Sequence, residues 1–288
     1  MKIFFRNEQV ANQPASFSPS ACKPALVVHD WLRRGLITQG DIHSFPPVTR
    51  ADLTLAHDPD FVQGILDLEI ENGFGTTDPE LTTSLYYTTG SLLAASRQAL
   101  GANEITCSPT SGFHHAGYAR AGGYCTFNGL MVVAMKLLKE GAVRQVGIID
   151  CDVHFADGTE DIIGRLRVRK QIKHHTMGNR FRSRSDVGPG ARGFFSWLQT
   201  AVEDCREADL VIYQAGADPH IDDPLGGLLT TAEMSRRDAE VFTQFQGRAL
   251  VWNLAGGYQV DDTGGIAPVL RLHRNTLRAA LVAHQEKP

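Results

Sequence analysis

An apolar run in the middle of the chain ends in three residues that can bind a metal ion. Val146 to Ile149 leads into Asp150, Asp152 and His154. A short apolar run bounded by polar residues predicts a buried strand of a parallel sheet, and ligands bind at the carboxyl ends of such strands. Because side chains alternate along a strand, we expect Asp152 and His154 to share one side and bind one cation, such as zinc.

Helix capping is the simpler interpretation of the same carboxylates. Asp150 and Asp152 could merely cap the helix that is predicted to begin near Asp157. Asp150 lies two residues before Asp152, so both side chains point to the same side of the strand. If Asp152 binds a metal, Asp150 could bind a second cation or orient a neighbouring residue.

Two further apolar runs also end in polar side chains. The run 209–214 leads into Asp218, and the run 248–254 leads into Tyr258. If these runs are strands of one sheet, Asp218 and Tyr258 lie at the same edge as the first metal-binding pair. Three protein ligands with an open fourth position are typical of catalytic zinc. The simpler alternatives are a turn residue before Pro219 and a loop aromatic.

A tandem pair, His114 and His115, lies in a glycine-rich loop. Hydrolysis by a metal-bound water needs one group that accepts a proton and another that donates one to the leaving group. Two imidazoles, each oriented by a carboxylate, would supply both, and Asp150 and Asp157 are available for that task. The alternative is an ordinary polar loop.

Composition excludes several classes of protein. The chain has 288 residues, which is one large domain or two small ones, and no clear domain boundary occurs within 1–288. It is 42 % hydrophobic and 21 % charged, with a net charge of -4, so we expect a soluble protein with no nucleic-acid or membrane partner. Five cysteines without Cys-x-x-Cys spacing indicate a reducing compartment. The apolar start is too short for a signal peptide, and a cytoplasmic location is expected.

Predicted strands alternate with predicted helices along most of the chain. Strands are expected at 2–5, 105–108, 146–149, 171–175, 209–214 and 249–254. Helices are expected at 24–36, from Asp58 onward, and at 80–100, 128–140, 158–166, 194–206, 232–245 and 264–284. This alternation predicts an α/β fold with a central parallel sheet. Residues 37–56 give no clear pattern.

Together the motifs resemble the histone deacetylase / acetylpolyamine amidohydrolase superfamily of zinc hydrolases. The resemblance runs from about Asp58 to Tyr258 and rests on motifs in the family's order. They are Gly112-Phe-His-His-Ala116 with Gly123-Tyr-Cys-Thr-Phe-Asn128, Asp150-Cys-Asp-Val-His154 with Asp157-Gly-Thr159, Gly216-Ala-Asp-Pro-His-Ile-Asp-Asp-Pro-Leu225, and Gly256-Gly-Tyr258. It implies an arginase-like single domain, with a mostly parallel sheet flanked by helices on both faces.

The resemblance also implies a role for each candidate residue. The zinc ligands would be Asp152, His154 and Asp218, with a potassium ion near Asp150. His114 and His115 would be the acid/base pair, backed by Asp150 and Asp157, with His115 as base. Tyr258 would polarise the acyl oxygen. Substrate contacts would come from Tyr124, Gly123, Gly256 and Asp78.

Three departures from the family pattern affect the pocket, the first at the floor under the metal and the other two at the rim. Phe155 replaces a usual second histidine, the segment Arg167 to Gly193 lacks the common Pro-Gly-Thr-Gly loop, and no His-Pro-Glu-type motif occurs near 18–30. The expected substrate is therefore an acylated amine in general: an acetyl-lysine peptide, an acetylpolyamine or a small acetyl-amide. A homo-oligomer is also left open.

Two other functions stay open on the sequence alone. An arginase-like ureohydrolase with two manganese ions would need a further carboxylate near Asp218, and Asp222 and Asp223 are close in sequence. An acyl-lysine-binding module would use the same pocket without turnover, although it would need neither a base nor an oxyanion donor. Asp/His/Asp ligation suits Fe²⁺ as well as Zn²⁺.

Overall fold

The computed structural model describes residues 1–12 and 16–285. Seven strands form one sheet in the order β2-β1-β3-β7-β6-β4-β5, and every strand pairing between described residues is parallel. The strands are β1 (Ile3–Phe4), β2 (Ile42–His43), β3 (Ile105–Cys107), β4 (Val146–Asp150), β5 (Ile172–Thr176), β6 (Leu210–Gln214) and β7 (Leu250–Asn253). The predicted α/β class is confirmed.

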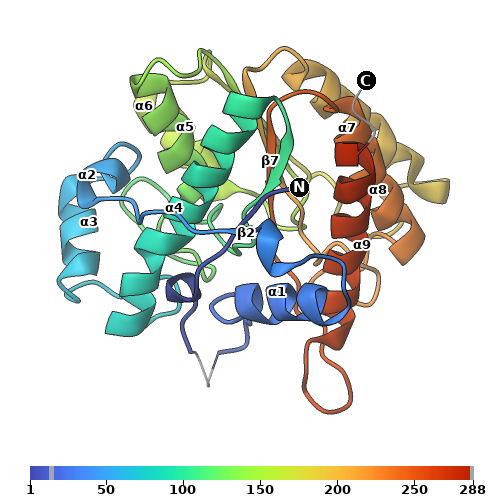
Figure 1. Cartoon of the computed structure of the whole chain (residues 1–288), viewed down its shortest axis with the longest axis horizontal. Helices are drawn as coiled ribbons and strands as arrows, with labels where there is room; N and C mark the ends of the chain where they lie inside the picture. Colours follow the sequence, from blue (N-terminus) through green and yellow to red (C-terminus); the bar gives the residue numbers. More distant parts are fainter. Residues whose placement is uncertain (13–15, 286–288) are drawn as a thin grey trace.

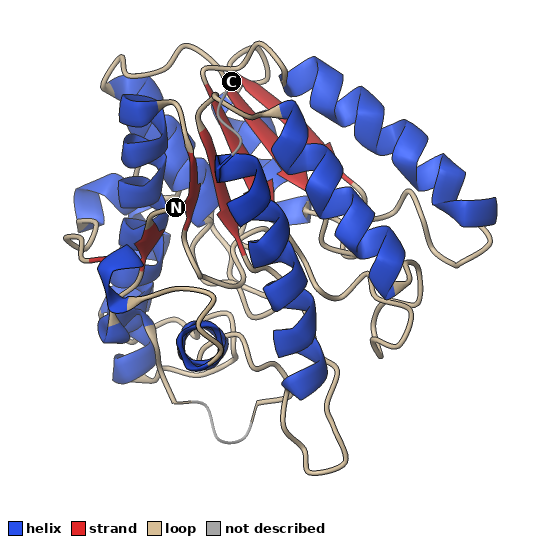
Figure 2. Ribbon diagram, turned by 45° about the vertical axis from the view of Figure 1, so that its right-hand side comes forward, coloured by secondary structure: helices blue, strands red, loops and turns tan. Residues whose placement is uncertain are grey.

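Helices cover both faces of this sheet (Figures 1 and 2). The longer ones are α1 (Lys23–Arg33), α3 (Pro59–Leu66), α4 (Pro79–Ala102), α5 (Gly129–Lys139), α6 (Asp157–Leu166), α7 (Arg192–Cys205), α8 (Thr231–Gln244) and α9 (Ala267–Gln285). One-turn elements are α2 (Arg50–Leu53) and 3-10 turns at Asn7–Gln9, Gln39–Asp41 and Pro189–Ala191. Each long helix lies within a few residues of its predicted position.

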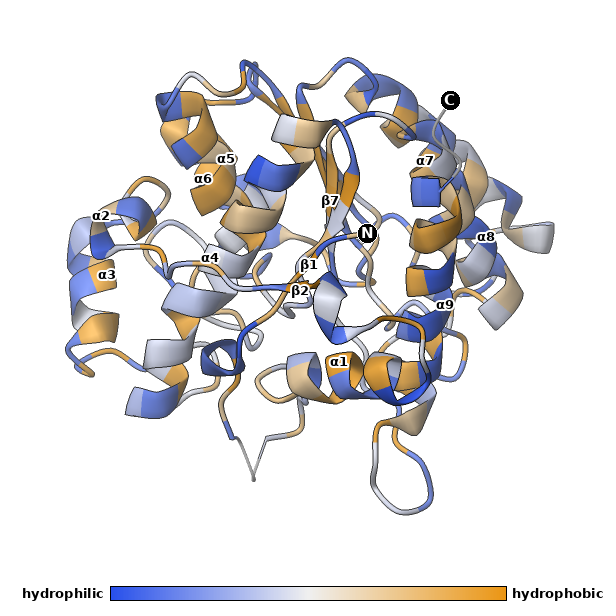
Figure 3. Ribbon diagram, viewed as in Figure 1, coloured by the Kyte–Doolittle hydropathy of each residue, from blue (hydrophilic) through white to orange (hydrophobic). Residues whose placement is uncertain are grey.

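The alternation of strand side chains separates the core into two layers. Ile149 and Tyr213 face the cluster formed with α1, α7, α8 and α9, whereas Ile148 and Ile212 face the cluster formed with α2 to α6. All four side chains are fully buried. Figure 3 shows the central strands as predominantly hydrophobic, while the helices carry hydrophilic stretches. Burial on both faces explains why these strands read as continuous apolar runs.

The strand register aligns the ends of three strands at one edge of the sheet. Asp150 of β4 pairs with Gln214 of β6, and Gln214 pairs with Asn253 of β7. Because the strands are parallel, the loops that follow these three residues leave from the same edge. They are the loops that carry the predicted metal ligands and Tyr258.

The segment 37–56 is where the sequence pattern was least informative. It contains β2 and α2, which the sequence did not predict. β2 has two residues and α2 has four, so neither is long enough to show a periodicity of 2.0 or 3.6 residues. The residues of β2 form a strand because they pair in parallel with β1, which is a tertiary contact.

Candidate metal centre and active site

Asp152, His154 and Asp218 meet at the aligned strand ends, as predicted. Strand β4 ends at Asp150, so the common direction of Asp152 and His154 comes from a bend and not from strand alternation. In that bend the His154 amide donates to Oδ1 of Asp152 over 3.0 Å. The capping alternative is wrong, because the N-cap of α6 is Ala156 and neither Asp150 nor Asp152 caps the helix.

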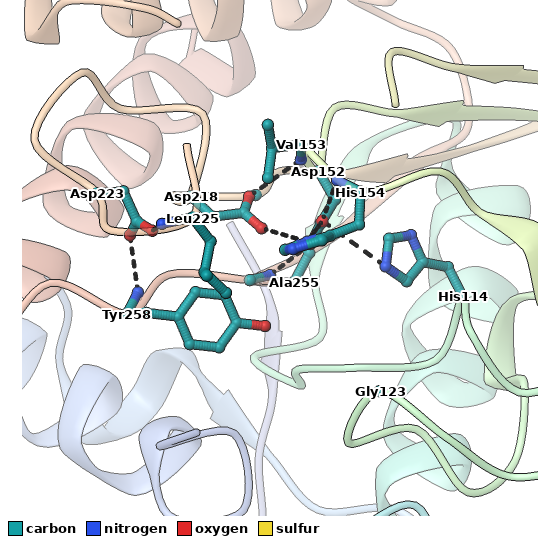
Figure 4. A network of polar contacts seen from close by, with 12 residues as sticks. His114, Gly123, Asp152, Val153, His154, Asp218, Asp223, Leu225, Ala255 and Tyr258 are labelled. Carbon is teal, nitrogen blue, oxygen red and sulfur yellow. Dashed lines mark hydrogen bonds and ion pairs between the residues drawn. The ribbon is translucent and has the colours of Figure 1, made fainter. Parts of the chain in front are cut away.

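The three side chains present their ligand atoms to a common point. One ligand atom from each lies within 4.8 Å of the others, in a group that could hold a metal ion. Nδ1 of His154 lies 2.9 Å from Oδ1 of Asp152 and 3.1 Å from Oδ2 of Asp218 (Figure 4). Both carboxylates are buried, and among the described residues Oδ2 of Asp218 accepts no hydrogen bond of good geometry.

The electrostatics of this group suit a cation. Burial alone would lower the pKa of His154, but its close contacts with the carboxylates of Asp152 and Asp218 raise it to about 11. Burial and the charge of Asp152 raise the pKa of Asp218 to about 8. Two buried carboxylates around one imidazole therefore carry more negative charge than the site can balance. A divalent metal would replace the imidazole proton and neutralise both carboxylates, so the donor set fits such an ion.

Each histidine of the tandem pair is bound by its own carboxylate. Nδ1 of His114 lies 2.8 Å from Asp150, and Nδ1 of His115 lies 2.7 Å from Asp157. The two ring centroids are 4.2 Å apart, and the His115 ring lies 5.6 Å from that of His154. A carboxylate at Nδ1 leaves the Nε2 atom of each ring for exchange of protons with a substrate or water.

The two imidazoles are in different electrostatic surroundings. Burial would lower the pKa of His114, but the charges of Asp150 and Asp152 raise it to about 9. Burial lowers the pKa of His115, and the neighbouring His114 adds to the effect. At neutral pH this arrangement favours a neutral His115, which can accept a proton.

Tyr258 approaches from the loop after β7. Its ring lies edge-on to His154, with centroids 6.2 Å apart and an interplanar angle of 89°. Figure 4 shows its hydroxyl and the ring of His114 beside His154. Burial, and the charges of Asp152 and Asp218, raise the pKa of the phenol. The hydroxyl therefore keeps its proton and can donate a hydrogen bond.

Comparison with known proteins agrees with this geometry. A model of the histone deacetylase domain matches residues 19–181, more than half of the 288-residue chain. The chain belongs to the histone deacetylase domain family.

Several relatives by sequence carry deacetylase or amidohydrolase names. An uncharacterized Picosynechococcus protein is 28 % identical over 269 residues, 87 % of this chain and 86 % of that protein. Acetylpolyamine amidohydrolase 2 of Pseudomonas aeruginosa is 30 % identical over 198 residues, 60 % of this chain and 56 % of that protein. Histone deacetylase 6 of Caenorhabditis elegans is 29 % identical over 181 residues, 54 % of this chain and 19 % of that protein.

Two solved structures show the same fold. An acetylpolyamine aminohydrolase from Burkholderia pseudomallei superposes with a TM-score of 0.78 over 97 % of this chain and 98 % of that chain, at 15 % identity. The HDA15 HD domain superposes with a TM-score of 0.74 over 100 % of this chain and 90 % of that chain, at 19 % identity. The described residues contain no helix with the length and hydropathy of a membrane span.

Two glycines of this histone deacetylase domain are required by close packing. A Cβ atom on Gly256 would lie 2.2 Å from Oδ2 of Asp218, and one on Gly123 would lie 2.5 Å from the ring of His115. Gly123 also has a φ of +55°. Any side chain at these positions would displace a candidate ligand or the candidate base. Contact of Gly123 and Gly256 with a substrate remains a prediction.

Tyr124 and Asp78 are the remaining predicted substrate contacts. Tyr124 follows Gly123, and its ring lies 5.4 Å from Phe74. Asp78 is the N-cap of α4, where its Oδ1 accepts the amide of Leu81 over 2.8 Å. A capping role accounts for one oxygen of Asp78, and a substrate contact stays a prediction.

The sequence did not reveal several residues that support the site. Nη1 of Arg237, from α8, donates to the carbonyl oxygens of Gly216 and Cys151 over 2.8 and 3.4 Å, so it connects the two loops that carry the candidate metal ligands. Lys23, fully buried in α1, donates to the carbonyl oxygen of Ala255. An amphipathic helix pattern cannot show that one of its charged residues points inward.

The departures noted in the sequence also have a structural counterpart. A Cβ atom on Gly178 would lie 2.1 Å from the backbone of His154 and Phe155. The segment 167–193 therefore packs directly on the turn that carries His154. Arg184 lies in the same segment, and both of its terminal nitrogens donate to the carboxylate of Glu233 in α8. These bonds hold the segment against α8.

Proposed function

We propose that this protein is a zinc-dependent deacylase that hydrolyses the amide of an acetylated amine. The relation of Tyr258 and His115 to the Asp152, His154 and Asp218 group carries the proposal. It combines a candidate base, a protonated phenol and a candidate metal-binding set within one site. Family membership and the names of the relatives support hydrolysis of an amide.

Four residues would hold the metal ion and activate the attacking water. Asp152, His154 and Asp218 would hold Zn²⁺, which when bound polarises the acyl oxygen and lowers the pKa of a coordinated water. His115 would accept a proton from the attacking water at Nε2, while Asp157 holds its Nδ1.

The remaining groups would stabilise and release the products. Tyr258 would donate a hydrogen bond to the developing oxyanion, the kind of contact whose loss costs about 10²- to 10³-fold in rate. A protonated histidine would then give its proton to the departing amine, and His114 suits that role because the charges of Asp150 and Asp152, against the effect of burial, raise its pKa to about 9. The products would be the free amine and acetate.

A potassium ion near Asp150 is part of the proposal only because the resemblance to the family implies one. Both carboxylate oxygens of Asp150 accept hydrogen bonds, from the amide of Asp152 over 3.0 Å and from Gln214 over 3.0 Å, besides the contact with His114. Backbone carbonyl oxygens would therefore have to supply most of its coordination.

The manganese ureohydrolase is less well supported by the geometry. Asp223 uses both oxygens to accept amide hydrogens, of Leu225 and Tyr258. The Asp222 side chain is 73 % exposed. Neither carboxylate is placed to complete a second metal site, and the metal-binding group found among the described residues has three members. An acyl-lysine-binding module would leave the acid/base pair and Tyr258 without a function.

The decisive experiment is hydrolysis of a small acetyl-lysine amide by the zinc-loaded protein, beside its Tyr258→Phe variant. We expect turnover that falls about 100-fold or more in the variant, with zinc content unchanged. Zinc bound in both proteins without turnover would argue against the proposal and favour the binding module. Two Mn²⁺ ions per chain with urea release from a guanidino substrate would favour the ureohydrolase.

A further inference from the structure

Tyr258 is held on two sides by residues that the proposed reaction does not use. Its backbone amide donates to Oδ2 of Asp223 over 2.8 Å (Figure 4). Its ring stacks on that of Phe17, with centroids 5.5 Å apart and an interplanar angle of 16°. One contact fixes the backbone of the residue and the other fixes the plane of its ring.

Asp223 connects the loop after β6 to the loop after β7. It is only 5 % exposed. Its other oxygen, Oδ1, accepts the amide of Leu225 over 3.1 Å. One buried carboxylate therefore fixes two backbone amides on different loops, and a carboxylate can do so because both oxygens accept hydrogen bonds. An asparagine offers one accepting oxygen, and its amide group would face the second N–H.

Phe17 belongs to a segment that is anchored beneath the same loop. Ser18 and Ser20 are buried and bond to each other over 2.8 Å. The hydroxyl of Ser111 lies 3.3 Å from that of Ser20 and donates to the carbonyl oxygen of Ala255 over 2.6 Å. Phe17 itself is 60 % exposed, so burial alone does not explain its position. The stacking of its ring on the ring of Tyr258 explains it.

The loop that carries Tyr258 has little regular structure of its own. Ala255 has a φ of +52° and Gly257 a φ of +145°, both outside the regions of helix and strand. A tyrosine on such a loop keeps rotational freedom unless other groups restrict it. An oxyanion donor must be placed to within a fraction of an ångström, because a displacement of about 1 Å can cost 10²-fold in rate.

We propose that Asp223 and Phe17 are positioning residues for Tyr258: they direct its hydroxyl toward the acyl oxygen of the substrate. The inference rests on the proposed function, since it assigns the means by which the oxyanion donor is held. Neither residue would touch the substrate. Their whole effect on catalysis would pass through the Tyr258 hydroxyl.

A double-mutant cycle tests this dependence. We expect Asp223→Asn to lower kcat about tenfold or more, and Phe17→Ala to lower it about 2- to 12-fold. KM and zinc content should change little, and Phe17→Tyr should restore activity because it keeps the stacked ring. In the Tyr258→Phe background, each change should cost less than about twofold further, because the hydroxyl they position is absent.

Matched controls and a structural readout complete the test. Asp222→Asn is the control for Asp223→Asn, because its side chain is 73 % exposed, and it should leave kcat unchanged. Full additivity with Tyr258→Phe would overturn the inference and indicate general damage to the fold. Crystal structures of the two single variants should show the Tyr258 hydroxyl displaced, and an unmoved hydroxyl in both would also overturn it. An inactive wild type would count against the proposed function, while these structures would still decide the positioning role.

Discussion

Oδ2 of Asp218 lies 3.1 Å from Nδ1 of His154, although the two residues follow different strands of the sheet. The aligned ends of β4 and β6 make this contact possible, since Asp150 and Gln214 are register partners. Arg237 then fastens the two loops to each other through their carbonyl oxygens. The candidate metal-binding group is thus built from two loops, and both the strand register and Arg237 fix the position of one loop relative to the other.

Asp218→Ala should abolish stable zinc binding. The change removes one of three ligands and leaves a buried pair, Asp152 and His154, that cannot complete the site. The loss of affinity should exceed the about 10- to 100-fold that follows removal of a residue behind a ligand. Zinc content after dialysis against a chelator is the measurement. Asp222→Ala is the control, and full retention of zinc by Asp218→Ala would disprove the ligand assignment.

Asp157→Asn should reduce turnover without loss of zinc. Asp157 holds Nδ1 of His115 over 2.7 Å and is itself bound by Arg120. Asparagine keeps the shape but removes the charge that stabilises the imidazolium formed when His115 accepts a proton. We expect kcat to fall about 10- to 100-fold. Steady-state kinetics with parallel metal analysis would check this, and an unchanged kcat would remove His115 from the role of base.

Arg237→Met should destabilise the fold strongly. Arg237 is fully buried, pairs with Asp238 over 2.8 Å and would leave that carboxylate without its cation. Loss of one partner of a buried pair costs about 3–5 kcal/mol. Arg236→Met is the matched control, because Arg236 is 56 % exposed and its pair with Glu240 should contribute about 1 kcal/mol or less. Urea unfolding measures both, and equal costs would contradict the prediction.

Glu233→Gln should destabilise the protein by about 1 kcal/mol at neutral pH. The hydrogen bond from Arg184 lowers the pKa of Glu233 from 4.5 to about 2. A carboxyl whose folded pKa is depressed stabilises the protein above its unfolded pKa, and this contribution disappears as the pH falls through the folded value. The difference in unfolding free energy between wild type and variant should therefore be constant above about pH 5 and shrink below it. Denaturant unfolding at a series of pH values measures it. A difference that grew with acidity would show that the charge pair is not its source.

The sequence by itself determined the sheet class and most of the candidate metal centre. Continuous apolar runs such as Val146 to Ile149 form strands because both faces of the sheet are covered, and parallel strands bring their polar ends to one edge. The same two properties of the sequence predict that Asp152, His154 and Asp218 lie together. The pairing of His114 with Asp150 and of His115 with Asp157 followed the resemblance to a known family, and the structure shows both contacts.

Only the tertiary structure decided which residues hold these groups in place. Phe17, Lys23 and Arg237 lie in segments whose local pattern is that of a loop or an ordinary amphipathic helix. Their partners are far away along the chain, so no periodicity could reveal the contacts. Likewise, its proximity to Asp218 in the sequence made Asp223 a candidate ligand for a second metal ion. In the folded chain both oxygens of Asp223 accept hydrogen bonds from backbone amides, which the sequence does not reveal. Long-range contacts form only when the loops of separate strands meet, and that meeting is a property of the folded chain.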